Sequence, residues 1–143
     1  STAPSRGRRA LISPPSKKLI DQVIGPEFSM FDTILMGGTG SEKMQILACS
    51  TFFKKALNNF QETNYGSIEI RPEGMIIHLN NGRRYHVWCI PYYRLAIYQT
   101  ETLSIHAEGQ VMKFKLKKNQ NRSFIKKLIQ QKAEFHDKLN NPS

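Results

Sequence analysis

The residues best suited to acid–base or nucleophilic chemistry are the histidines and cysteines, and their spacing forms no catalytic motif. They are His78, His86, His106, His136, Cys49 and Cys89. A Cys–His pair would need a tertiary contact that spacing alone does not indicate, and no two of these residues are separated as zinc ligands usually are. We therefore expect no catalytic residue, no metal, no cofactor and no enzyme. A small hydrolase that uses Cys49 or Cys89 is a minor alternative.

A glycine-rich stretch, residues 37–43 (GGTGSEK), precedes a predicted helix, where backbone amides could hold a phosphate oxygen. The glycine and lysine spacing of a P-loop is missing, and Glu42 would place a negative charge where the anion should sit. We interpret this stretch as a linker.

The positive charge of the chain lies at its two ends. The 143 residues carry 21 Lys and Arg against 11 Asp and Glu, a net charge of +10. Residues 1–24 contribute +4, residues 25–112 contribute −1 and residues 113–143 contribute +7. Basic ends favour an anionic partner such as a lipid surface, although net charge also serves solubility alone. The residues expected to bind an anionic surface are Lys113, Lys115, Lys117, Lys118, Arg122, Lys126 and Lys127.

Nucleic-acid binding is the alternative function, because aromatic residues lie near basic ones. Trp88, Tyr92 and Tyr93 are candidates for stacking on bases, beside Arg84 and Arg94. No zinc-finger, helix-turn-helix or RNP-like signature accompanies them. Packing in the core explains Trp88 and Tyr92 equally well, and we favour packing.

Apolar periodicity predicts one long helix followed by a run of strands. Residues 41–62 carry apolar side chains at three- and four-residue steps, and Ser41 suits the N-cap. After Gly66 the period changes to two, and turn residues separate six strands within residues 66–117. The short connections leave no room for crossover helices, so the strands should be antiparallel. Residues 30–36 are a further apolar stretch that could supply a seventh strand.

The end of the chain predicts an amphipathic helix over residues 123–140. Phe124, Leu128 and Phe135 belong to its apolar stripe, and lysines and glutamines lie opposite. The predicted fold class is therefore α+β: an antiparallel bent sheet or partial barrel of six or seven strands, capped by a C-terminal helix and preceded by a helix. We expect one domain, residues 27–143.

Residues 1–26 read as a basic tail or a docking segment. Pro14-Pro15 interrupts any helix, and residues 19–24 then have helical apolar spacing that Ser16 could cap. Two helical turns are unstable alone, so this piece must dock or stay unfolded. The expected docking place is a groove between the C-terminal helix and an edge strand. The predicted docking residues are Leu11, Ile12, Leu19, Ile20, Val23 and Ile24.

Residues 25–29 (GPEFS) followed by Met30 resemble a junction between a fused segment and a start methionine. Two origins for residues 1–24 therefore stay open: a native segment, or a fused or vector-derived one. The origin of residues 1–24 decides whether their charge of +4 belongs to the native protein.

Residues 66–139 resemble a bacterial pleckstrin-homology-like domain. The resemblance rests on the hairpin strands up to Trp88, on residues 88–95 (WCIPYYRL), on residues 103–109 (LSIHAEG) and on the helix that begins at Phe124. It implies a bent sheet closed by the last helix, and a fold that recognises lipid headgroups or peptides and rarely catalyses. A polo-box-like module is the second resemblance on the same topology.

These patterns together predict a non-catalytic binding or scaffolding module. Its expected partner is a protein segment or an anionic lipid surface, with nucleic acid as the alternative. The longest apolar runs are too short to cross a bilayer, so we expect no transmembrane segment. The expected location is the cytoplasm, at most peripheral to the membrane.

Overall fold

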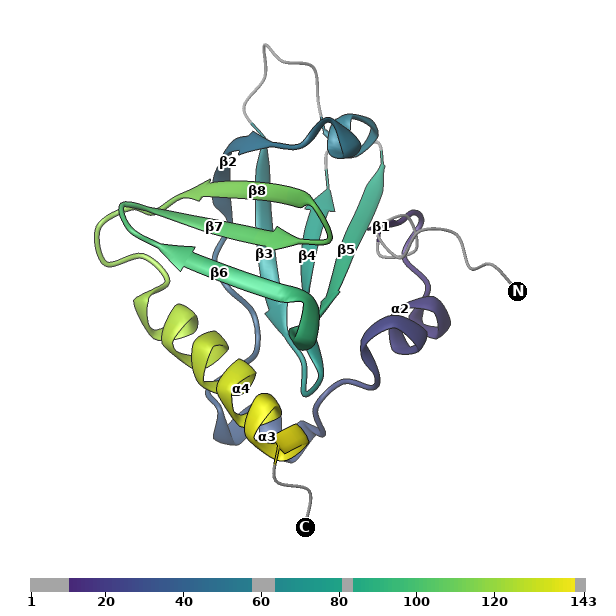
Figure 1. The fold of residues 1–143 in the computed structure, drawn as a ribbon, viewed down its shortest axis with the longest axis vertical. Helices are drawn as coiled ribbons and strands as arrows, with labels where there is room; N and C mark the ends of the chain where they lie inside the picture. The colour runs from purple at the N-terminus through teal and green to yellow at the C-terminus, as the bar shows by residue number, and fades with distance from the viewer. Residues whose placement is uncertain (1–10, 58–63, 81–83, 141–143) are drawn as a thin grey trace.

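The computed structural model describes residues 11–57, 64–80 and 84–140 and is an α+β fold. Eight antiparallel strands form one open sheet in the order β1-β5-β4-β3-β2-β8-β7-β6 (Figure 1). The strands are β1 (Leu11–Ile12), β2 (Met44–Cys49), β3 (Tyr65–Ile70), β4 (Gly74–Asn80), β5 (Tyr85–Pro91), β6 (Leu95–Gln99), β7 (Thr102–Ala107) and β8 (Gln110–Lys115). The helices are α2 (Lys17–Ile24), α3 (Met30–Leu35) and α4 (Arg122–Asn140), with 3-10 turns η1 (Thr51–Ala56) and η2 (Tyr92–Arg94).

The six strands expected after Gly66 are confirmed as consecutive hairpins. β3, β4 and β5 pair in sequence order, and so do β6, β7 and β8. Side chains alternate along them as the pattern of period two requires. In β5, for example, Trp88 and Ile90 enter the main core, while Val87 and Cys89 point to the opposite face.

The expected helix over residues 41–62 is wrong. Residues 44–49 form β2, which pairs with β3 on one side and β8 on the other and so joins the two groups of hairpins. A register shift between Ile46 and Ala48 breaks the alternation of β2, which made its apolar residues look helical. Ser41 caps no helix, because its hydroxyl accepts a hydrogen bond from the Ile68 amide at 2.8 Å. Residues 58–62 of the expected helix lie outside the described residues.

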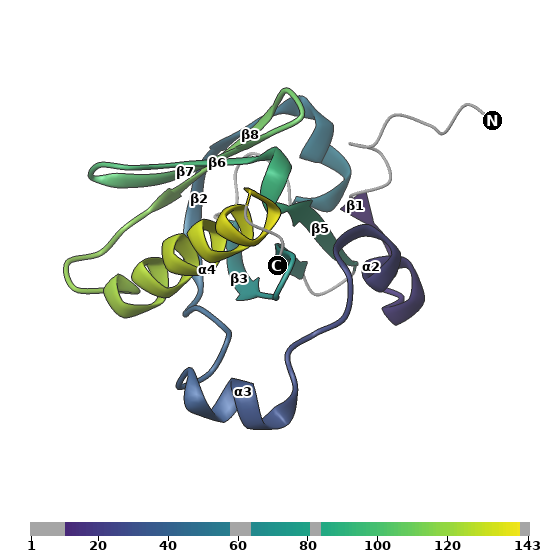
Figure 2. The same ribbon diagram turned by 60° about the horizontal axis from the view of Figure 1, so that its bottom comes forward.

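The suggestion that residues 30–36 supply a strand is also wrong, because Met30–Leu35 form α3 and Met36 is its C-cap. The Ser29 hydroxyl caps this helix by accepting a hydrogen bond from the Asp32 amide at 3.1 Å. The strand count rises above seven because β1 and β2 both join the sheet. Figure 2 shows α3 standing below the sheet, apart from the strands.

The main core lies on the inner face of the bent sheet and is closed by α4. Phe124, Ile125 and Leu128 of α4 are buried in it together with Trp88 and Phe114 of the sheet. The helix begins near its expected position, and Phe124, Leu128 and Phe135 of its predicted apolar stripe pack against the core. Ile129 and Leu139, which were expected in the same stripe, are 47% and 57% exposed. Sealing the open side of the sheet removes the large core side chains from water, which is the main stabilising contribution in a small fold.

Candidate segment-binding site

A second apolar cluster lies on the outer face of the sheet, on the side away from the main core. Ile76 of β4 and Val87 and Cys89 of β5 form its floor. Ile12, Ile20 and Ile24 cover this floor from the N-terminal segment, and each is at most 7% exposed. A sheet face can be buried only if another element covers it, so residues 11–24 complete the burial of this face.

The first contact of this segment is strand addition at the edge of the sheet. β1 pairs antiparallel with β5, with Leu11 opposite Trp88 and Ile12 opposite Val87. Unpaired N–H and C=O groups of an edge strand are a template for an added strand. Because side chains alternate, Ile12 reaches the outer cluster while Leu11 packs against the main core.

The second contact is the amphipathic helix α2. The Ser16 hydroxyl accepts a hydrogen bond from the Leu19 amide at its start, and Gly25 ends it with φ of +75°. Ile20, Val23 and Ile24 face the sheet at three- and four-residue spacing. Leu19 was expected to dock, but it is 46% exposed because it lies on the solvent side of α2.

Arg71 anchors the end of α2 to the sheet. Its Nη1 donates to Asp21 Oδ1 at 2.9 Å and to the Gly25 carbonyl oxygen at 3.2 Å. Its Nε donates to Glu69 Oε2 at 3.3 Å, and its side chain is only 7% exposed. Hydrogen bonds from Arg71 and then from Lys17 lower the pKa of Asp21. Asp21 is therefore held as a carboxylate beside the guanidinium.

A series of hydrogen-bonded polar side chains continues from Arg71 across the outer face. Glu69 Oε1 lies 3.0 Å from Nε2 of His78, whose Nδ1 lies 2.5 Å from the Tyr85 hydroxyl. The hydrogen bond from His78 lowers the pKa of Glu69, although burial acts in the opposite direction. Sequence reasoning missed this group. The signal was available, because the turn before Gly74 sets a register that places Glu69 and His78 on one face.

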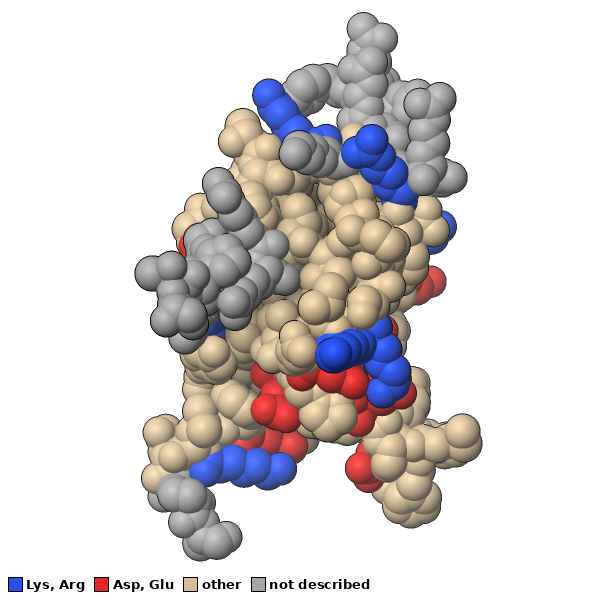
Figure 3. Space-filling view, turned by 90° about the vertical axis from the view of Figure 1, so that its right-hand side faces the viewer, with Lys and Arg blue, Asp and Glu red and all other residues tan. Residues whose placement is uncertain are grey.

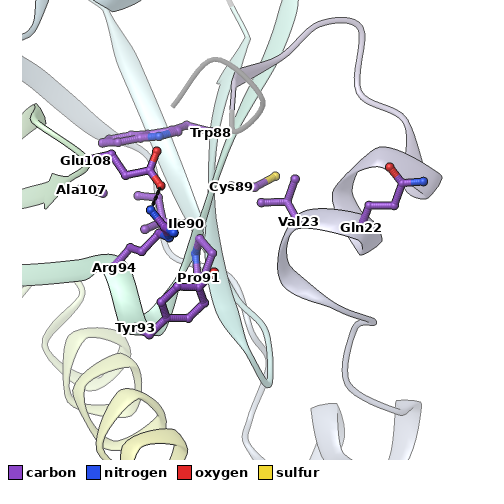
Figure 4. Close-up of a pocket in the computed structure, with 10 residues that line it drawn as sticks. All are labelled: Gln22, Val23, Trp88, Cys89, Ile90, Pro91, Tyr93, Arg94, Ala107 and Glu108. Atoms are coloured by element: carbon purple, nitrogen blue, oxygen red, sulfur yellow. Dashed lines mark hydrogen bonds and ion pairs between the residues drawn. The ribbon is translucent and has the colours of Figure 1, made fainter. Parts of the chain in front are cut away.

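A pocket of about 210 Å³ lies next to the docked segment, near the end of β5 that β1 does not cover. Figure 4 shows Val23 of α2 and Cys89 pointing toward each other on one side of β5, with Arg94 and Glu108 on the other. Arg94 donates a hydrogen bond to Glu108 and its guanidinium lies over the Tyr93 ring, 5.1 Å from the ring centre. The pocket is lined by Gln22, Val23, Trp88, Cys89, Ile90, Pro91, Tyr93, Arg94, Ala107 and Glu108.

The site is poor in activated nucleophiles. Burial raises the pKa of the Cys89 thiol to about 12 and also raises that of Cys49. A thiol with a raised pKa holds little of the thiolate that nucleophilic catalysis needs. Burial, followed by the charge of Arg84, lowers the pKa of His86. His86 lies in β5 one residue from Val87, on the face opposite Cys89, so the two do not form a pair.

The expected docking groove is in the wrong place. Residues 11–24 lie at the β5 edge and on the outer face, whereas α4 closes the inner side of the sheet (Figures 1 and 2). The reason is that β5, not a strand beside α4, offers both a free edge and an apolar outer face. Figure 3 views the molecule from the α2 side and shows acidic and basic side chains next to one another over its lower half.

The residues expected to bind an anionic surface divide into two groups. Six are exposed, with Lys113 and Lys115 alternating along β8 opposite the uncharged Ser104 and Thr102. Lys127 differs, because its ammonium donates to the carbonyl oxygens of Met36 and Gly38 at 3.2 and 3.1 Å. The exposed six are Lys113, Lys115, Lys117, Lys118, Arg122 and Lys126.

Two of the three aromatic residues considered for stacking are core residues. Trp88 is 1% exposed and its ring centre lies 4.6 Å from that of Phe53. Tyr92 is fully buried and its hydroxyl donates to the Arg71 carbonyl oxygen at 2.6 Å. Neither can meet a base at the surface, so that suggestion is corrected. Tyr93 is 54% exposed.

Comparisons with family models, curated proteins and solved structures each found no match to this chain. Within residues 11–57, 64–80 and 84–140, no helix is long and apolar enough to cross a membrane. In the same residues, no group of three or more His, Cys, Asp or Glu side chains is arranged to hold a metal ion.

Proposed function

We propose that this protein is a non-catalytic recognition module for an extended protein segment that ends in an amphipathic helix. The segment adds as a strand to the β5 edge and lays its helix on the outer face of β4 and β5. Residues 11–24 occupy this site within the chain. The observation that carries the proposal is the antiparallel pairing of β1 with β5, followed by burial of Ile20 and Ile24 against the sheet.

Specificity in this proposal comes from two features of the occupant. Alternate apolar residues reach the floor of Ile76, Val87 and Cys89, and an acidic residue in the helix meets Arg71. Burial of one isoleucine side chain contributes about 1.5–3 kcal/mol before ordering costs. Arg71 adds specificity for an acidic residue, because an occupant without one leaves Nη1 of this buried guanidinium without its carboxylate partner, while Nε keeps its contact with Glu69.

A non-catalytic role is supported by the chemistry of the site. Its cysteine has a raised pKa, and its histidine nearest the surface is already hydrogen bonded to Glu69 and Tyr85. The resemblance to pleckstrin-homology-like domains points in the same direction, since an antiparallel sheet with a C-terminal helix is compatible with that fold. Folds of this kind host many functions, so the resemblance is an analogy and the site carries the argument.

The test supplies the segment from a second molecule. In the full-length chain, Ile20→Asp with Ile24→Asp releases α2, because two charges cannot be buried against Ile76 and Val87. A fluorescent peptide of residues 10–26 is then titrated into this variant and into the unmodified chain. We expect micromolar binding to the variant and at least tenfold weaker binding to the unmodified chain, whose tethered segment competes at high effective concentration.

A peptide that carries the same two aspartates is the matched control and should not bind. Far-ultraviolet circular dichroism and the emission of Trp88, the single tryptophan, report whether the variant keeps its sheet. If the variant is folded and the natural peptide does not bind it, the proposal is wrong.

Binding to an anionic surface is the second candidate, favoured by the exposed lysines of β8. Lys113 and Lys115 share one face, and their cross-strand partners Ser104 and Thr102 carry no charge that would neutralise them. Basic side chains near an anionic leaflet contribute about 1 kcal/mol each. Lys113→Glu with Lys115→Glu should abolish co-sedimentation with phosphatidylserine vesicles.

The control for this test makes a charge reversal outside the row, at the exposed Lys43. Lys43→Glu should leave most of the vesicle binding intact. Binding to single-stranded oligonucleotides that exceeds vesicle binding and falls steeply with salt would favour the nucleic-acid alternative.

A further inference from the structure

The short helix α3 presents its apolar side to solvent. Met30, Phe31, Ile34 and Leu35 are 81%, 69%, 70% and 68% exposed. At 100° per residue these four side chains fall within an arc of about 140° on the helix surface. A surface helix of a monomeric fold normally turns such a stripe toward the core, whereas α3 buries none of its residues.

A cleft of about 320 Å³ opens beside this apolar face, between α3 and α4. Leu35 belongs both to the exposed face and to the wall of the cleft. The other apolar residues that line the cleft are Phe28, Met36, Pro72 and Phe135. The polar residues that line it are Asp32, Gln131, Glu134 and Lys138. A projecting apolar group and a hollow that could receive one therefore lie next to each other on one surface.

We propose that this surface binds a second copy of the chain and forms a two-fold symmetric dimer. In a two-fold interface the same patch contacts itself, so it must carry both the projection and the hollow. Phe31 of each copy would enter the α3–α4 cleft of the other, and Ile34 and Met30 would pack across the axis. The polar border of the cleft forms the rim that interfaces of this kind have around an apolar centre.

The area available fits a weak dimer. Four large apolar side chains exposed to this degree offer roughly 600 Å² on each copy, the upper end for a patch on a monomer. Two such faces bury roughly 1,200 Å², which is the lower end for specific interfaces. We therefore expect a dimer with a Kd in the micromolar range. In dilute solution most of the protein would then be monomeric.

The charges around α3 favour a second copy over a membrane. Asp32 and Glu134 line the cleft with Lys138, and the ammonium of Lys127 donates to the carbonyl oxygen of Met36 beside it. The local charges therefore balance, and an anionic leaflet gains little there. Two copies with a net charge of +10 each repel one another at long range. Added salt screens this repulsion and should tighten the dimer, whereas it would weaken binding to anionic vesicles.

Sedimentation velocity of the 143-residue chain over two decades of concentration tests the proposal. We expect a reversible monomer–dimer equilibrium that tightens several-fold when salt is raised. Phe31→Ser and Ile34→Ser should each weaken association at least tenfold, since central apolar residues dominate such interfaces. These side chains are exposed, so the variants should fold, which circular dichroism checks.

Leu47→Ser is the matched control, because Leu47 is a 45% exposed apolar residue of β2, outside α3 and the cleft. It should leave the dimer unchanged. A monomer at every concentration would overturn the proposal, and so would a dimer that both α3 variants leave intact. Binding of the wild-type chain to phosphatidylserine vesicles that is lost in Phe31→Ser, without any dimer, would assign the face to lipid instead.

Discussion

At the residue scale, Arg71 links the N-terminal segment to the sheet. It is a buried cation that contacts Asp21, Glu69 and the backbone of Gly25 at once. Burying a guanidinium is costly unless its N–H groups find hydrogen-bond acceptors. Loss of one of these contacts therefore weakens the case for keeping Arg71 buried against the others. The neighbouring Lys17 also contacts Asp21, but at the exposed surface.

Replacing Arg71 should therefore cost far more than replacing Lys17. Arg71→Met keeps the apolar stem and removes the charge, and we expect a loss of about 2 kcal/mol in the free energy of unfolding. Lys17→Met removes an exposed ion pair of the same carboxylate and should cost at most about 0.5 kcal/mol. Urea titration measures both. Equal losses in the two variants would contradict this account of the anchor.

The two cysteines should differ in their reaction with a thiol reagent. Cys89 is fully buried under α2 with its pKa raised to about 12, and Cys49 is partly exposed with a smaller rise in pKa. In mildly alkaline solution Cys49 should react first, and Cys89 should react only when α2 leaves the sheet.

The Ile20→Asp, Ile24→Asp variant supplies the comparison for this experiment. Release of α2 should increase the labelling rate of Cys89 at least tenfold and change that of Cys49 little. A rapid reaction of Cys89 in the unmodified chain would instead revive a nucleophilic role for this thiol.

At the element scale, Gly74 lets the start of β4 pack closely against both β5 and α2. A side-chain carbon placed there would lie 2.4 Å from the Ile90 carbonyl oxygen and 2.9 Å from Cγ2 of Ile24. The first neighbour is backbone of β5 and cannot move without breaking the pairing of Gly74 with Pro91. This glycine is required by close packing, not by an unusual backbone angle.

Gly74→Ala should consequently destabilise both the start of β4 and the packing of α2 against the sheet. We expect a loss of at least about 2 kcal/mol in the free energy of unfolding, in the range found for overpacked sites. Gly40→Ala is the control, because a side-chain carbon at Gly40 has nothing within 4 Å. Chemical denaturation followed by Trp88 emission compares the two, and an unaffected Gly74→Ala variant would show that the close approach is not maintained.

At the scale of the whole molecule, stability should decline in acid in two stages. His86 has a pKa lowered from 6.5, so the unfolded chain binds its proton more readily and stability falls as pH drops below about 6.5. Glu69 and Asp21 have pKa values lowered from 4.5 and 3.8, and their contribution is present above these values. It is lost as pH falls through the lower values of the folded state.

Urea titrations at a series of pH values measure this profile. His86→Gln should flatten the decline that begins as pH falls below about 6.5. Glu69→Gln should flatten the decline below about pH 4.5 and lower stability at neutral pH, where its carboxylate pairs with Arg71 and His78. A stability that rises on acidification would contradict the stated direction of these pKa shifts.

The antiparallel hairpins, the C-terminal helix and the short helix before Gly25 are predictable from sequence patterns alone, because each is encoded by neighbouring residues. Alternation in β3 to β8, the apolar stripe of α4 and the Ser16 and Gly25 caps act over a few positions of the chain. Local patterns of this kind can be read without knowing what the element packs against.

The role of residues 44–56, the placement of residues 11–24 and the contacts of Arg71 with Asp21 and Gly25 depend on packing between distant elements. β2 is a strand because it supplies hydrogen-bonded partners to both β3 and β8. Its own sequence does not predict a strand, because the register shift breaks the alternation of its side chains. The N-terminal segment lies on the outer face because β5 offers a free edge there, and because Ile76 of β4 with Val87 and Cys89 of β5 would otherwise be uncovered. These interactions form between residues that are distant in the chain, and local periodicity does not predict them.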